Sequence, residues 1–160
     1  MDPQKVEAAK KSRESLPAEE FPEGNWGVVT NGCQLSLRFT KTNYTNGEPV
    51  EVILLLRNVT NQTARLNYLR RAELLDGPAT FQIISDSGKV IPEHYPSAQL
   101  FEGGFIATCP LPGTQHKYVE HLNRGYDLTN GTYNVRAVIR MTNNSPPTEV
   151  KSAPVTIKIK

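Results

Sequence analysis

Apolar residues in this chain recur with a period of two, and that period constrains the fold more than any other feature. Apolar and polar side chains alternate over residues 35–40, 133–141 and 153–160, as in strands with one buried face. Runs of weaker pattern cover residues 50–58, 65–69, 81–84, 89–91 and 115–122. No amphipathic helix pattern interrupts the series after Trp26. We therefore predict an all-β fold, an antiparallel β-sandwich of about seven to nine strands.

The alternation also predicts which side chains face the core. Tyr133 begins an inward-facing run after the turn signal Asn130-Gly131, so we expect its ring in the core and its hydroxyl on a nearby backbone carbonyl. The predicted core consists of Leu35, Leu37, Phe39, Val52, Leu54, Leu56, Phe81, Ile83, Tyr133, Val135, Ile139, Val155 and Ile157.

The first 24 residues differ in composition from the rest of the chain. Residues 2–23 carry four Lys and Arg against six Asp and Glu, with Val6, Leu16 and Phe21 as the large apolar side chains. Such a segment cannot bury a face of its own. We predict a polar tail or linker over residues 1–24, disordered or weakly helical, and one sandwich domain over residues 25–160.

Charge and motif content exclude several classes of function. The formal net charge is +2 and the basic residues are scattered, which argues against a nucleic-acid partner. No apolar run reaches the roughly 20 residues of a membrane-spanning helix, so we expect no membrane insertion. His116 and Glu120 share one face of a predicted strand, but one histidine and one carboxylate make a poor metal site. We expect solvated polar side chains there, no catalytic, cofactor or metal site, and no enzymatic activity.

The two cysteines leave one question open. Cys33 is in phase with the inward-facing residues of its strand, whereas Cys109 lies in a proline-rich loop. Either they form a disulfide or both thiols are unpaired, and we favour the second alternative. Asn- and Thr-rich segments with several N-x-[ST] triplets favour a bacterial surface-associated, periplasmic or extracellular domain over a cytoplasmic one.

The order of strands and turns resembles a known family. Gly47-Glu48-Pro49 leads into the strand over residues 50–58, a hairpin signal lies at residues 86–89, and Leu111-Pro112-Gly113 and Asn130-Gly131-Thr132 precede later strands. This succession resembles the immunoglobulin-like domains related to the bacterial intracellular proteinase inhibitor (BsuPI-like), and more loosely fibronectin-III modules. The resemblance implies an immunoglobulin-like sandwich and an inhibitory activity. The Trp-containing segment of the family is replaced here by residues 94–97.

One predicted strand is apolar on both faces. Within residues 50–56, Ile53 and Leu55 occupy the face on which other strands place polar residues. Either another part of the chain covers this face, with residues 21–26 as the candidate, or Ile53 and Leu55 contact a partner protein.

Two long irregular segments, residues 70–80 and 92–113, supply the remaining candidates for binding. We rank a non-catalytic protein-interaction or accessory domain first. A proteinase inhibitor is second, acting through the extended segment 107–113. A carbohydrate-binding accessory module is third, acting through loop aromatics. The candidate residues in these segments are Tyr95, Phe101, Phe105, Pro110, Leu111 and Pro112.

Overall fold

The computed structural model describes residues 25–61, 66–69, 79–94, 105–108, 115–141 and 148–160. The predicted tail over residues 1–24 lies outside this set. The described strands are β1 (Cys33–Phe39), β2 (Asn43–Tyr44), β3 (Glu51–Asn58), β4 (Leu66–Leu69), β5 (Thr80–Ser85), β6 (Phe105–Thr108), β7 (Gln115–His121), β8 (Gly131–Met141), β9 (Thr148–Lys151) and β10 (Val155–Ile159), with the 3-10 turn η2 (Leu122–Arg124) after β7. In the part of the chain that is described, no helix is both long and apolar enough to cross a membrane.

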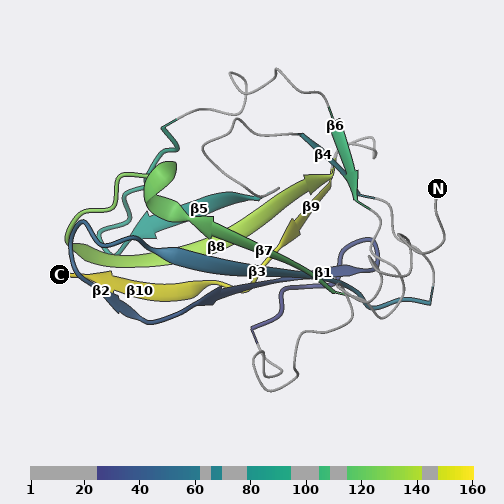
Figure 1. Cartoon of the computed structure of the whole chain (residues 1–160), viewed down its shortest axis with the longest axis horizontal. Helices are drawn as coiled ribbons and strands as arrows, with labels where there is room; N and C mark the ends of the chain where they lie inside the picture. The colour runs from purple at the N-terminus through teal and green to yellow at the C-terminus, as the bar shows by residue number, and fades with distance from the viewer. Residues whose placement is uncertain (1–24, 62–65, 70–78, 95–104, 109–114, 142–147) are drawn as a thin grey trace, which may run out of the picture.

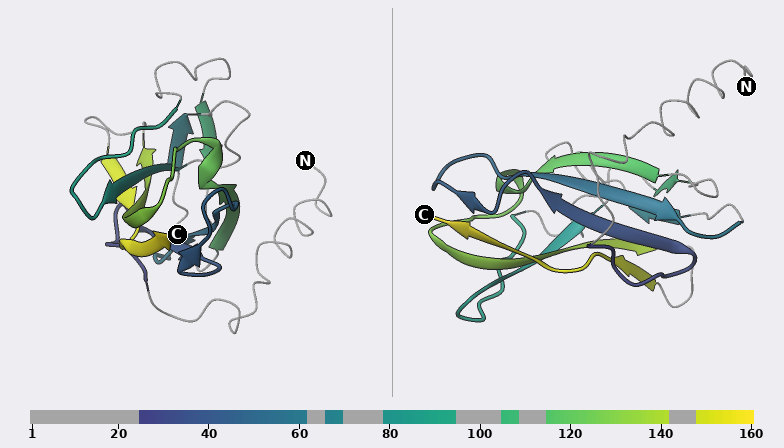
Figure 2. Two further views of the ribbon diagram at one scale, coloured as in Figure 1. Left: turned by 90° about the vertical axis from the view of Figure 1, so that its left-hand side faces the viewer. Right: turned by 90° about the horizontal axis from the view of Figure 1, so that it is seen from below.

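The strands form two sheets that face each other (Figures 1 and 2). One sheet has the order β1-β3-β7, and the other has the order β2-β10-β8-β5 with β9 also paired to β8. A small separate sheet joins β4 to β6. The chain is thus an all-β sandwich, as the alternation predicts, and of the immunoglobulin-like type that the resemblance implies. One edge departs from the antiparallel expectation, because the short β2 runs parallel to β10.

The core lies between the two sheets and matches the alternation closely. Every predicted core residue is buried except Phe39 and Val155, which are half-buried and pack against the core from its rim. Tyr133 is buried, and its hydroxyl donates to the backbone carbonyl of Thr129 at 2.8 Å, as predicted. A second buried tyrosine also bonds to the backbone, but as an acceptor. The Tyr126 hydroxyl accepts the buried backbone N–H of Phe81 at 2.9 Å.

Three strands were not predicted, and one predicted strand is absent from the described residues. Residues 89–91 form no strand of their own; they contribute one bridge, between Val90 and Ile84, and backbone hydrogen bonds to Ser85 and Ile83. The three unpredicted strands, β2, β6 and β9, are short and show no clear period of two. β2 and β6 pair with strands distant in the sequence, whereas β9 pairs with the preceding strand, β8, at a bulged edge. Phe105, predicted to lie in a loop, is the first residue of β6 and is paired with Leu69.

The second face of β3 is covered from within the chain. Leu55 has no exposed surface. Its cross-strand partner on β1, Ser36, forms a β-bridge with Trp26. The Arg57 guanidinium lies 3.8 Å from the centroid of the Trp26 ring, a cation–π contact over the same face. Trp26 belongs to the segment proposed as the cover, which accounts for an apolar run on both faces.

Two polar residues of β7 depart from the expectation of solvated side chains. The register places His116 opposite Leu56 and Glu120 opposite Val52, on the inward face of the sheet. Glu120 is consequently buried, and His116 is half-buried. The alternation gave the shared face correctly, but it could not show that this face points inward, since β7 carries polar residues on both faces.

Candidate functional site

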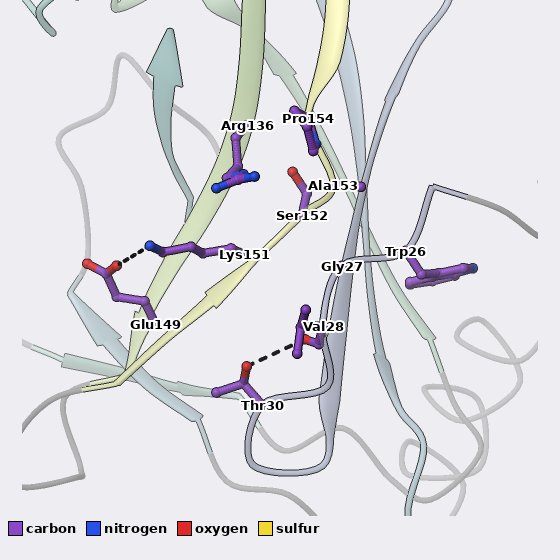
Figure 3. A pocket seen from close by; sticks show the side chains of 10 residues that line it. All are labelled: Trp26, Gly27, Val28, Thr30, Arg136, Glu149, Lys151, Ser152, Ala153 and Pro154. Carbon is purple, nitrogen blue, oxygen red and sulfur yellow. Dashed lines mark hydrogen bonds and ion pairs between the residues drawn. The ribbon is translucent and has the colours of Figure 1, made fainter.

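A hollow of about 350 Å³ opens at one seam of the sandwich, where residues 26–30 cross beside β9 and the start of β10 (Figure 3). All of its lining residues belong to the described part of the chain. They are Trp26, Gly27, Val28, Thr30, Arg136, Glu149, Lys151, Ser152, Ala153 and Pro154. This surface is therefore built from three separate parts of the chain, namely residues 26–30, Arg136 of β8 and residues 149–154.

A bulge in the strand β9–β10 forms one wall of the hollow. β8 pairs Val138 with Lys151 and Val135 with Val155, so three residues, 152–154, lie opposite two on β8. Pro154 has no N–H to donate to the ladder. Ser152 restores the pairing, because its N–H donates to the Ala137 carbonyl at 2.9 Å and its hydroxyl accepts the Ala137 N–H at 2.8 Å. The bulge is therefore a fixed feature of the backbone.

The opposite wall is held by a close backbone contact at Gly27. A Cβ atom on Gly27 would lie 1.8 Å from the carbonyl oxygen of Lys151, a distance that no side chain can adopt. The Gly27 N–H donates to the Leu35 carbonyl at 3.0 Å, and the Gly27 carbonyl accepts Gln34 Nε2 at 2.9 Å. These bonds tie the segment to β1 while its backbone presses against β9, which fixes the width of the seam.

Arg136 is the unusual polar residue of the hollow. Its Nε is shielded from solvent, yet no hydrogen-bond acceptor for it exists among the described residues. The nearest carboxylate of the lining, that of Glu149, instead lies 3.5 Å from Lys151 Nζ (Figure 3). A guanidinium is a planar donor suited to carboxylates and phosphates. Arg136 thus presents donor capacity that the described fold does not use.

Apart from Trp26, the apolar residues of the lining are aliphatic. Val28 has 81% of its surface exposed, and the backbone beside it is held by a hydrogen bond from Thr30 Oγ1 to the Val28 carbonyl at 3.4 Å. Ala153 and Pro154 contribute from the bulge. The Trp26 ring points away from the hollow in Figure 3, toward the face where Arg57 contacts it.

The predicted site residues lie elsewhere. Leu55 has no surface to offer a partner because the chain covers it, and Ile53 is half-buried beside Val119. Phe105 starts β6. Ala107 and Thr108, the first residues of the proposed inhibitory segment, are already paired with β4. The remaining predicted site residues lie outside the described part of the chain, namely Tyr95, Phe101, Pro110, Leu111 and Pro112.

Sequence reasoning did not identify Arg136 or Val28. A Ser-Ala-Pro triplet inside an alternating run was the available signal, because proline within a strand marks an edge or a bulge. Nothing in the sequence places residues 26–30 beside that bulge.

Two histidines of the described residues lie beside carboxylates. His94 Nε2 lies 2.7 Å from Asp127 Oδ1, and His121 Nε2 lies 3.5 Å from Glu51 Oε2. The Cys33 thiol is free, and burial raises its pKa above the usual value, so it is held as the neutral thiol. Cys109 lies outside the described residues. Among those residues, no three His, Cys, Asp or Glu side chains are grouped so as to hold a metal ion.

Comparison with known proteins identifies the fold. No family model and no curated protein matches this sequence. Among solved structures, the chain is similar to the C-terminal domain of wzt, with a TM-score of 0.53 and 10% identity over 88% of this chain and 79% of that one. A β-glucosidase from Listeria innocua with bound glucose gives a TM-score of 0.44 at 8% identity over 92% of this chain. This chain corresponds to only 21% of that enzyme.

Proposed function

We propose that this chain is a non-catalytic protein-interaction domain, and that the hollow between residues 26–30 and the β9–β10 bulge is its contact surface. The observation that carries the proposal is the combination of Val28, which is almost fully exposed, with Arg136, whose Nε has no acceptor among the described residues. Exposed apolar side chains beside an arginine are the composition of protein-binding surfaces.

The construction of the hollow also supports a binding role. Its two walls are held by backbone contacts, at Gly27 on one side and at Ser152 on the other. A rigid surface loses little conformational entropy when a partner binds. The similarity in fold to the C-terminal domain of wzt, which is one domain of a larger protein, is compatible with an accessory role.

The test is a photo-crosslink from the hollow. In a Cys109→Ser background, a benzophenone attached at Val28→Cys is compared with the same group at Val90→Cys, an exposed valine of the β5 hairpin. Cys33 is buried and does not compete for the label. We expect a discrete protein adduct from position 28 in extracts of the native host, and none from position 90. Equal labelling at both positions, or an adduct removed by glycosidase, would contradict the proposal.

A further inference from the structure

We propose that the hollow recognises a carboxylate, supplied by an acidic side chain in an extended segment of the partner, and that Arg136 is the residue that binds it. This inference rests on the proposed function and specifies its chemistry. It begins from an imbalance in hydrogen bonding, because Arg136 Nε is shielded from water and has no acceptor among the described residues.

Among the described residues around Arg136, no carboxylate forms an ion pair with its guanidinium. On the same face, β5 supplies Thr80, Gln82 and Ile84, with Gln82 directly opposite Arg136. β10 supplies the neutral Thr156 and the basic Lys158. The one carboxylate of the lining, on Glu149, is beside Lys151. Among these described neighbours, the guanidinium therefore has no anionic partner of its own.

The charge balance favours a singly charged ligand. Arg136 and Lys151 contribute two positive charges to the lining and Glu149 one negative charge, which leaves +1. A carboxylate neutralises that charge and matches the fork of the guanidinium. A phosphate dianion would exceed that charge, and Glu149 would repel it more strongly than it repels a singly charged carboxylate.

The apolar lining favours a peptide over a sugar acid. A pyranose ring is usually stacked on an aromatic face, but the lining presents Val28, Ala153 and Pro154, and the Trp26 ring is directed elsewhere (Figure 3). Val28 provides an aliphatic contact for the residue next to the acidic one. The combination fits an acidic residue flanked by aliphatic residues.

The experiment is an NMR titration of the arginine Nε–Hε resonances in the full chain. The probe is the peptide acetyl-Gly-Val-Asp-Val-Gly-amide, with the Asn analogue, inorganic phosphate and glucuronate as comparisons. The Arg136 resonance is assigned by its loss in Arg136→Gln. We expect a saturable shift of that resonance with the Asp peptide and about tenfold weaker binding of the Asn analogue, the value for one charge-assisted hydrogen bond.

A matched control lies on the same strand and face. Arg140 is exposed and outside the hollow, so Arg140→Gln should retain the binding that Arg136→Gln abolishes. Tighter binding of phosphate or glucuronate, equal binding of the Asn peptide, or no saturable shift would overturn the carboxylate assignment. A specific photo-adduct at position 28 together with any of these results would leave the interaction function standing. Loss of that adduct with intact carboxylate binding would overturn the interaction function instead.

Discussion

Two polar side chains of β8, Tyr133 in its first half and Arg136 at the start of its second half, differ in whether the fold satisfies their hydrogen bonds. In the first half, the Tyr133 hydroxyl enters the sandwich and is satisfied by the Thr129 carbonyl at 2.8 Å. In the second half, Arg136 Nε is shielded from solvent without an acceptor among the described residues. The first arrangement is complete within the fold and therefore stabilises it. The second is incomplete within the described fold, which is the pattern expected of a group that awaits a ligand.

The largest effect should come from breaking the core between these two halves. Val135 is fully buried and is paired with Ile83 and Val155. Val135→Asp buries an unpaired charge, and we expect the protein not to fold. Far-UV circular dichroism and the dispersion of amide resonances measure this. Asn134→Asp, at an exposed neighbouring position, should fold normally. A folded Val135→Asp protein would show that the register of β8 is wrong.

The seam that positions Arg136 should be the next most sensitive feature. Gly27→Ala introduces a methyl group where the Lys151 carbonyl lies, and the backbone must move to admit it. We expect a loss of about 1–3 kcal/mol in the free energy of unfolding, the usual cost of overpacking. Val28→Ala, at the exposed neighbour, should change stability by less than about 0.5 kcal/mol in the same denaturant titration. Equal effects of the two substitutions would refute the close contact.

Removing the polar groups of Tyr133 and Arg136 in turn tests whether only the first stabilises the fold. Tyr133→Phe deletes the bond to Thr129 and should cost about 1 kcal/mol of stability. Arg136→Met deletes a donor that the described fold leaves unused, so we expect a change within about 0.5 kcal/mol or a small gain. Chemical denaturation of both variants measures the difference. A large loss in Arg136→Met would mean that Arg136 is structural, and the contrast between the halves of β8 would fail.

The smallest effect concerns an exposed group that is satisfied within the fold. The Glu48 carboxylate pairs with Lys41 and accepts the Thr45 N–H at 2.8 Å, and the bond from Lys41, followed by that from Thr45, lowers its pKa. Because the folded pKa is below the unfolded value of about 4.3, this stabilisation is present above that pH and is lost as the pH falls through the folded pKa.

Thermal unfolding from pH 7 to pH 3 should therefore show a slightly shallower acid dependence in Glu48→Gln than in the parent. Lys41→Met removes the same pair from the other side. The double variant should match the two single variants, and additive effects would show that the groups act independently.

The alternation predicted the long strands and the core because it records a local property, the burial of every second side chain. β1, β8 and β10 show that alternation clearly, as does the role of Tyr133, whereas β3, β5 and β7 were recognised from runs of weaker pattern. Short strands such as β6 carry too few residues to show a period, and their pairing depends on segments distant in the sequence. The same limitation placed Phe105 in a loop. The inward face of Glu120 was not recognised for another reason, because β7 carries polar residues on both faces.

The sequence by itself determined that this chain is an all-β sandwich and which residues form much of its core, and it left open whether the second face of β3 is covered within the chain or contacts a partner. Only the tertiary structure decided that Trp26 lies beside that face and that residues 26–30 meet the bulge at residues 152–154. It also decided that Arg136 Nε has no acceptor among the described residues. The physical reason is that the alternation of apolar and polar residues within a strand shows which of its side chains are buried. Whether a buried donor finds an acceptor depends instead on which distant segments of the chain pack beside it.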